Sequence, residues 1–318
     1  MISFLSIDDN NQMCKSIHMS NKRRDSMYKI VTDSCCDLPY EIIKRENIDF
    51  IPLEVIMNDE IFFDDFGQTI DTNDFYKKLK EGVVPTTSQI NVSRYSDFFR
   101  QYAEKNIPVL YICFSSGMSG SYQSALLAVE IIKKEFPNAE IYIMDSLSAS
   151  GGQGMMVLDA LNNLKANMTF DENILWLEKH KMNYNHWVLV DDLEHLYRGG
   201  RLSKSTARIG ELLNVKPILA INKEGKLVVH SKVRTKKKTV SSIADKVVDA
   251  INTSPDSNKQ VVIITNSGDL ATAELLRDII LDQAIPKEIL ICDLGATIAS
   301  HTGYGCVAAF VTGPERSK

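Results

Sequence analysis

The sequence has few of the features that mark several large protein classes. No apolar run among its 318 residues approaches the roughly 18 residues that cross a bilayer. Acidic residues (41) outnumber basic ones (36), and the net charge of −5 lacks the overall positive balance of a general nucleic-acid or anionic-membrane binder. The overall charge does not exclude a local basic patch.

Cysteine and histidine, with six of each, are too scattered to predict a metal site. The cysteines form no C-x-x-C pair or zinc-ligand spacing, and no H-E-x-x-H motif occurs, so we expect no catalytic metal. Cys113, Cys292 and Cys306 lie in apolar segments, where a thiol packs as a small core side chain. We recognise no secretory signal and therefore expect reduced thiols and a cytoplasmic protein.

Residues 1–26 differ from the rest of the chain. A short apolar stretch is followed by Asp8 and Asp9, and basic residues 22–24 come after it, which reverses the order of a signal peptide. We expect a flexible polar leader here. Met27, directly before the first strand-like run, is an alternative start.

The remaining chain has ordinary globular composition, with 44% hydrophobic and 24% charged residues, and a length typical of two domains. In residues 27–170, apolar strands alternate with helical patterns, which predicts a parallel sheet covered on both faces. Expected strands are 28–33, 50–57, 61–64, 108–114 and 140–145, and expected helices are 39–47, 72–80, 92–105, 121–136 and 155–164.

Residues 171–318 predict a second, mixed α/β domain, with a β-hairpin formed by 217–222 and 226–232. We place the boundary between 165 and 185. The other expected strands are 186–191, 260–265, 288–293 and 306–312, and the expected helices are 171–183, 238–252 and 271–283.

Four polar loops follow strands of the first half, at residues 32–34, 86–89, 115–121 and 145–146. Ligands of open α/β sheets bind beyond the carboxyl ends of strands, so these loops are the candidate site. The serine- and glycine-rich loop 115–121 offers hydroxyls and N–H groups to an anion, although Ser119 or Ser121 could simply cap the helix that follows. The candidate lining residues from these loops are Asp33, Ser34, Ser88, Ser115, Ser116 and Gly120.

Familiar catalytic templates are missing from the sequence. It contains no P-loop, no G-x-G-x-x-G fingerprint and no G-x-S-x-G elbow, since Ser121 stands where the last glycine of the elbow belongs. Ser119, His301 and Asp33 nevertheless leave a serine-dependent acyl hydrolase open as an alternative. A binder of a phosphate or sugar through the serine-rich loop is a second alternative.

Three arginines and one histidine stand out in the second half. His301 lies in a polar loop flanked by glycine and is a candidate for the site, with a structural role, satisfied by backbone groups, as the more common alternative for a lone histidine. Arg198 and Arg201 could pair with carboxylates, recognise phosphate or form a solvated turn. Arg234, with lysines 236–238, precedes a helix where cations oppose the dipole, which favours a docking role over a plain exposed face.

Taken in order, these loops resemble the DegV family over residues 30–305, nearly the whole chain after the leader. Ile90 departs from the family pattern, which commonly has proline after T-S-Q. The matching segments are residues 32–34, 37–39, 87–89, 115–124, 145–146, 152–154, 198–203 and 300–305.

The resemblance implies a two-domain fold, with an N-terminal Rossmann-like parallel-sheet domain, a C-terminal mixed α/β domain and a long-chain fatty acid between them. It implies a lipid-binding subunit, without catalytic activity or cofactor, that presents the carboxylate to an ATP-dependent fatty acid kinase subunit and carries the acyl phosphate. Thr87, Ser119 and His301 match the family's head-group residues. Transient contact with a membrane or an acyltransferase is a further expectation.

Physical reasoning adds two expectations to the resemblance. A carboxylate that must react and leave is better held by neutral hydroxyls than by a bidentate arginine. Separately, we expect Arg198, Arg201 and the run 234–238, which begins with Arg234, to meet the kinase partner or the emerging acyl phosphate. Met118, Met155 and Met156 are candidates for an adaptable tail-binding wall, with ordinary core packing as the alternative.

Overall fold

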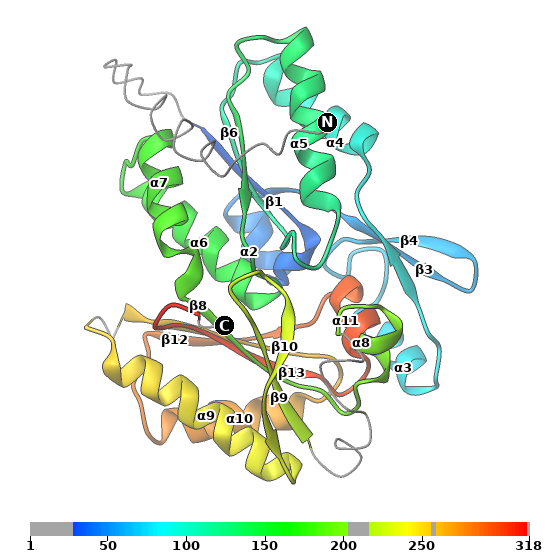
Figure 1. Ribbon diagram of the computed structural model, residues 1–318, viewed down its shortest axis with the longest axis vertical. Helices are drawn as coiled ribbons and strands as arrows, with labels where there is room; N and C mark the ends of the chain where they lie inside the picture. Colours follow the sequence, from blue (N-terminus) through cyan, green and yellow to red (C-terminus); the bar gives the residue numbers. More distant parts are fainter. Residues whose placement is uncertain (1–27, 203–215, 256–258, 317–318) are drawn as a thin grey trace, which may run out of the picture.

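In the computed structural model, which describes residues 28–202, 216–255 and 259–316, the first half of the chain forms a four-stranded parallel sheet (Figure 1). The strand order β2-β1-β6-β7 joins β1 (Lys29–Asp33), β2 (Asp49–Ile51), β6 (Val109–Cys113) and β7 (Ile141–Asp145). Every residue of β6 is buried, because α4 (Val92–Ala103) and α5 (Ser121–Glu135) cover one face and α6 (Gly151–Lys165) covers the other. The predicted parallel sheet is confirmed.

A small antiparallel sheet extends from this half. Its order is β4-β3-β5, with β3 (Leu53–Met57), β4 (Glu60–Asp64) and β5 (Thr86–Ser88). Asn58 and Asp59 form the expected turn, both with positive φ. The prediction of a loop at 86–89 is corrected in part, because β5 is a strand, too short for periodicity to reveal and formed by pairing with β3.

The second half contains a six-stranded sheet in the order β10-β9-β8-β13-β11-β12. Only β11 and β12 are parallel neighbours, so the expected mixed character and the β9–β10 hairpin are confirmed. The strands are β8 (Tyr184–Leu189), β9 (Lys216–Ile221), β10 (Leu227–Val233), β11 (Val261–Asn266), β12 (Glu288–Asp293) and β13 (Val307–Thr312).

Helices cover both faces of this sheet. In Figure 1, α9 (Lys236–Thr253) and α10 (Leu270–Leu281) lie below it, and α6 lies above it, against β8, β11 and β13. Because α6 also contacts β1 and β6, one helix packs between the sheets of the two halves. The other helical segments are α2 (Tyr40–Arg45), α3 (Thr72–Lys80), α7 (Phe170–His180), η1 (Ser34–Cys36) and η2 (Lys181–Asn183).

Two short helices were not predicted, α8 (Glu194–Arg198) and α11 (Ala296–Thr302). His301 therefore lies in the last turn of α11, and the expectation of a polar loop at this position is corrected. The predicted leader at residues 1–26 lies outside the described residues, and the domain boundary near residue 170 stays a prediction. Within the described ranges, no helix is both long and apolar enough to cross a membrane.

Candidate ligand-binding site

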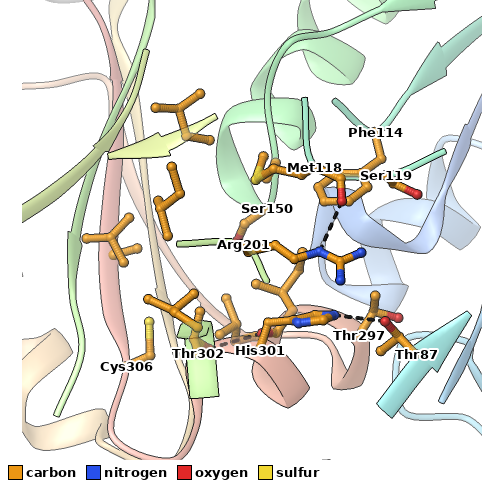
Figure 2. A pocket seen from close by; sticks show the side chains of 18 of the residues that line it. Thr87, Phe114, Met118, Ser119, Ser150, Arg201, Thr297, His301, Thr302 and Cys306 are labelled. Carbon is orange, nitrogen blue, oxygen red and sulfur yellow. Dashed lines mark hydrogen bonds between the residues drawn. The ribbon is translucent and has the colours of Figure 1, made fainter. Parts of the chain in front are cut away.

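A narrow, largely apolar cavity of about 70 Å³ lies where the two halves of the chain meet. Its walls are mostly aliphatic and aromatic, but hydroxyl, imidazole and guanidinium groups gather in one part of it (Figure 2). The apolar lining includes Leu53, Phe114, Met118, Val188, Leu196, Ile221, Leu227, Ala308 and Phe310. The polar lining includes Thr87, Ser119, Arg201 and His301, called the polar group below, together with Ser88, Gln89, Ser150, His186, Thr297 and Thr302.

Thr87 and His301 meet across the two halves. Thr87 Oγ1 lies 2.8 Å from His301 Nε2, and Figure 2 shows the two side chains pointing toward each other. Burial, followed by the nearby charges of Arg201 and His195, lowers the pKa of His301 to about 4. The imidazole is therefore neutral at pH 7.

Two buried carboxylates from the first half hold the start of α11, the helix that carries His301. Asp37 Oδ1 accepts a hydrogen bond from the N–H of Gly295 (3.0 Å), and the Asp64 oxygens accept from Ala296 (3.2 Å) and Thr297 (2.9 Å). Burial raises the pKa of Asp64 to about 6 and raises that of Asp37 in the same direction. The position of α11 thus depends on side chains more than 200 residues away in sequence.

Gly199 gives His301 the room that it occupies. A Cβ atom at this position would collide with His301 Nδ1. The following Gly200 has φ of +70°, which ends α8 and turns the chain so that the next side chain, Arg201, enters the cavity.

Arg201 and Ser119 complete the polar group. The Arg201 guanidinium donates from Nε to the Met118 carbonyl (3.0 Å) and from a terminal nitrogen to the Gly199 carbonyl (2.6 Å). Ser119, in the loop between β6 and α5, donates to Ser121 Oγ (2.9 Å) and accepts from the Ser121 N–H (3.1 Å). Sequence reasoning considered Arg201 for pairing, phosphate recognition or docking and not for the cavity wall, although its G-G-R motif was already visible.

Among the other predicted lining residues, Ser88 lines the cavity and donates to Glu54 (2.6 Å). Asp33 and Ser34 do not line it, which corrects that prediction. Asp33 is fully buried and accepts hydrogen bonds from four groups of the protein, and Ser34 Oγ accepts from the Leu53 N–H (3.0 Å). Both residues brace the loops around the strand ends.

Ser115, Ser116 and Gly120 are also placed outside the cavity wall. Ser115 Oγ donates to the Gly225 carbonyl (2.8 Å) and so links the two halves. Ser116 is exposed, and Gly120 precedes α5 beneath the side chain of Gln89. Loop 115–121 therefore contributes Met118 and Ser119 to the cavity and uses its other groups for structure.

Arg198 and Arg234 are exposed and lie outside the cavity. Arg198 pairs with Glu194 at 3.2 Å, one helical turn away. Both remain available for the docking role proposed from the sequence.

The arrangement does not match a serine hydrolase. Ser119 Oγ is hydrogen-bonded to Ser121 and His301 to Thr87, so nucleophile and base are not paired. His301 Nδ1 has no partner in the described part of the chain, and Asp33 is occupied elsewhere. Within the same ranges, no group of three or more His, Cys, Asp or Glu residues is arranged to hold a metal ion.

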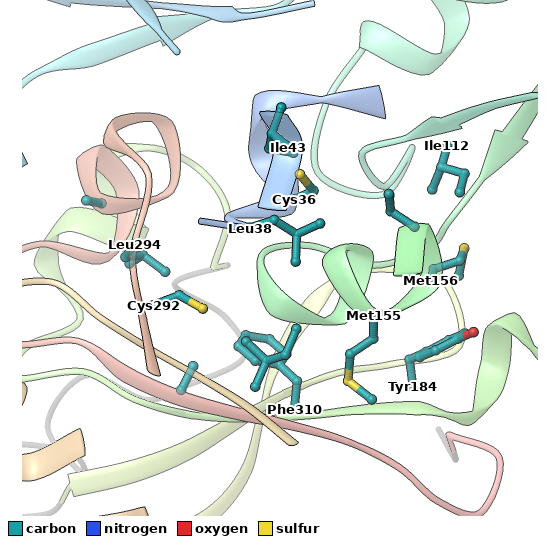
Figure 3. Packing of buried hydrophobic residues seen from close by; sticks show 14 of the residues in the cluster. Cys36, Leu38, Ile43, Ile112, Met155, Met156, Tyr184, Cys292, Leu294 and Phe310 are labelled. Carbon is teal, nitrogen blue, oxygen red and sulfur yellow. The ribbon is translucent and has the colours of Figure 1, made fainter. Parts of the chain in front are cut away.

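The three methionines have different surroundings. Met118 lines the cavity (Figure 2). Met155 and Met156 pack in the central apolar cluster, where Figure 3 shows Met155 beside Tyr184 and near Phe310. Only Met118 is placed to form an adaptable wall.

Comparisons with known proteins agree over almost the whole chain. Residues 27–313 match the family described as "Uncharacterised protein, DegV family". A DegV domain-containing protein of Clostridium perfringens is 36% identical over 289 residues, which cover 91% of this chain and 98% of that protein.

Solved structures of two relatives have the same fold. A DegV family protein from Thermus thermophilus, described as binding fatty acid, gives a TM-score of 0.80 at 31% identity and covers 90% of this chain and 99% of its own. DegV of Bacillus subtilis, described as a fatty acid binding protein, gives a TM-score of 0.79 at 28% identity. The match covers 91% of this chain and 100% of the B. subtilis chain. The two-domain α/β architecture is therefore shared.

Proposed function

Because the chain belongs to the DegV family, we propose that its cavity holds one long-chain fatty acid, with the carboxylate at the polar group and the tail along the apolar walls. The observation that carries this proposal is the asymmetry of the cavity, which is mostly apolar and gathers Thr87, Ser119, Arg201 and His301 in one part. A ligand with one anionic end and a long apolar body fits such a lining.

The polar group suits a carboxylate that is bound and later released. A neutral His301 that donates from Nε2 to Thr87 Oγ1 leaves the threonine hydroxyl hydrogen free to bind a carboxylate oxygen. Arg201 adds positive charge, but its Nε–H is already donated to the Met118 carbonyl, so the side-on bidentate clamp through Nε is not available. The attraction is thereby weaker than that of a full arginine clamp.

The tail supplies most of the affinity. At about 0.8 kcal/mol per buried methylene, a C16 chain contributes roughly 10–12 kcal/mol as an upper bound.

The test of this function is denaturing extraction of the purified protein, followed by mass spectrometry of the organic phase. We expect one fatty acid per chain, and its loss in the double variant Thr87→Ala/Ser119→Ala. The matched control is Thr86→Ala/Ser116→Ala, which removes neighbouring hydroxyls that do not line the cavity. A folded wild-type protein without lipid would overturn the proposal.

We further propose that the protein, without catalysis of its own, presents the carboxylate to a separate ATP-dependent kinase subunit in the cytoplasm. A carboxylate oxygen would attack the terminal phosphorus of ATP, the bond to ADP would break, and the acyl phosphate would stay bound by its tail. The exposed cations Arg198 and Arg234 would face the kinase subunit.

Charge reversal tests this second role. Arg198→Glu/Arg234→Glu should retain the fatty acid and form acyl phosphate more slowly when the kinase subunit and ATP are added. An unchanged rate would contradict the docking assignment, and the extraction experiment would still stand by itself.

A further inference from the structure

The ladder between β8 and β9 is the short one of the six-stranded sheet. Their hydrogen-bonded ladder contains the pairs Val188–Leu219 and Leu189–Ile218, yet β8 extends back to Tyr184 and β9 extends forward to Ile221. The register, continued by two residues, places Ile221 opposite His186, beyond the last paired residues. Across this stretch the two strands are not held together by ladder hydrogen bonds.

A different cavity lies on each face of the sheet here, one lined by Ala149 and Ser150 next to α6 and the other by Lys246 and Asp249 of α9. The second cavity, of about 250 Å³, is lined by Trp187, His230 and Lys246. His186 and Ile221 are the two residues that line both cavities. They therefore form the partition between the cavity proposed for the tail and the second one.

His186 is a rigid part of this partition. It is 2% exposed, its Nε2 lies 2.7 Å from Ser148 Oγ, and its ring meets Phe310 edge-on at 5.3 Å. A Cβ at Gly152 would collide with the imidazole, so the start of α6 also confines the ring. Burial, and then the charge of Arg316, lowers the pKa of His186 well below its usual value, which keeps the ring neutral.

The partition lies at the end of the cavity away from the polar group. Along β13, Ala308 pairs with Val188 and Phe310 with His186. Phe310 is four residues beyond Cys306, a distance of about 13 Å at 3.3 Å per strand residue. Cys306 follows α11 closely in the chain, so along β13 the lining runs from the neighbourhood of His301 to Phe310 beside His186.

We propose that His186, together with Ile221, closes the far end of the tail cavity and so sets the longest fatty acid that this protein retains. This inference rests on the proposed function. A longer tail would have to displace the imidazole and enter the second cavity, whose lining includes the charged groups of Lys246, Asp249 and Arg316. An apolar chain end gains little there.

The test is competition among chain lengths. Delipidated protein is incubated with an equimolar mixture of saturated acids from about C12 to C22, separated from free acid, extracted and measured by mass spectrometry. His186→Ala should retain longer acids than wild type, with a gain of about fifteenfold for two extra carbons at about fourfold per buried methylene. Ile221→Ala removes a smaller part of the partition than His186→Ala does. It should shift the distribution of retained chain lengths in the same direction.

The matched control is His230→Ala, which removes an imidazole that lines only the second cavity and should leave the distribution unchanged. Suppose that wild type retains fatty acids and that His186→Ala and Ile221→Ala both retain the same distribution of chain lengths. The inference is then wrong, and the proposed function stands. If wild type retains no acid, the proposed function fails and the inference falls with it.

Discussion

His301 shows how neighbours set the chemistry of a single side chain at this site. Its imidazole is neutral because burial and two nearby basic groups disfavour the charged form, and its Nε2 is directed at Thr87. The same residue in a solvated loop, as the sequence suggested, would titrate near pH 6.5.

Removal of the Arg201 charge should raise the pKa of His301. In Arg201→Ala we expect a value above 4 but still below 6.5, because burial is the larger cause and remains. An NMR titration of the imidazole resonances measures this shift. Arg198→Ala, which removes an exposed arginine paired with Glu194, is the control and should leave the pKa unchanged.

Gly199 should matter only through His301. Its φ of −71° suits any residue, so Gly199→Ala costs no backbone strain, and the added methyl group instead displaces the imidazole. We expect the free energy of unfolding to fall by about 1–3 kcal/mol, typical of overpacking, and fatty-acid binding to weaken with it. In a double-mutant cycle, Gly199→Ala should add little to His301→Ala, whereas additive losses would contradict the assignment.

At the scale of elements, α11 makes stability depend on pH. Asp64 has a folded pKa of about 6 against a usual 3.8, so the protonated form is favoured in the folded state. Its contribution is complete below pH 4 and is lost as the pH rises through 6, a change of about 3 kcal/mol.

Urea denaturation of Asp64→Asn and wild type at pH 4 and pH 6.5 checks this effect. Relative to wild type, the variant should gain about 2 kcal/mol of unfolding free energy between the two pH values, because its side chain does not titrate and wild type loses most of its Asp64 contribution over this interval. Asp37 titrates in both proteins and largely cancels in the comparison. A constant difference would contradict the role of Asp64.

Elements with strong local patterns were predictable from the sequence, and elements held by distant contacts were not. The helix at 72–80 was predicted with its observed bounds, because its apolar spacing and the glycine that follows it are local signals. The short α11 and β5 owe their structure to Asp64 and to pairing with β3, which no local pattern reveals.

The same limit applies to the candidate site. The family resemblance singled out Thr87, Ser119 and His301, and the fold brings all three to one cavity. Asp33 and Ser34 looked equally suitable, because polar residues after a strand can line a site or brace a loop. Arg201 enters the cavity through a turn at two glycines, whose direction depends on the packing of α8 against α11.

At the scale of the whole molecule, a ligand in this cavity touches both halves at once. Binding should therefore stabilise the protein as one unit, by about 4 kcal/mol at a ligand concentration of 1,000 times Kd. We expect palmitate to raise the melting temperature by about 5–10 °C in calorimetry. Thr87→Ala/Ser119→Ala should show a smaller rise, and an equal rise in both proteins would contradict the site.

The order of the six-stranded sheet has a consequence for how the protein is made. Its last strand in sequence, β13, lies between β8 and β11 in the interior of the sheet. On a ribosome, the parallel sheet of the first half can form as soon as its strands emerge, but the second sheet stays divided until residues 307–312 have been synthesised. A nascent chain therefore has no complete cavity, and the binding of any ligand there must follow translation.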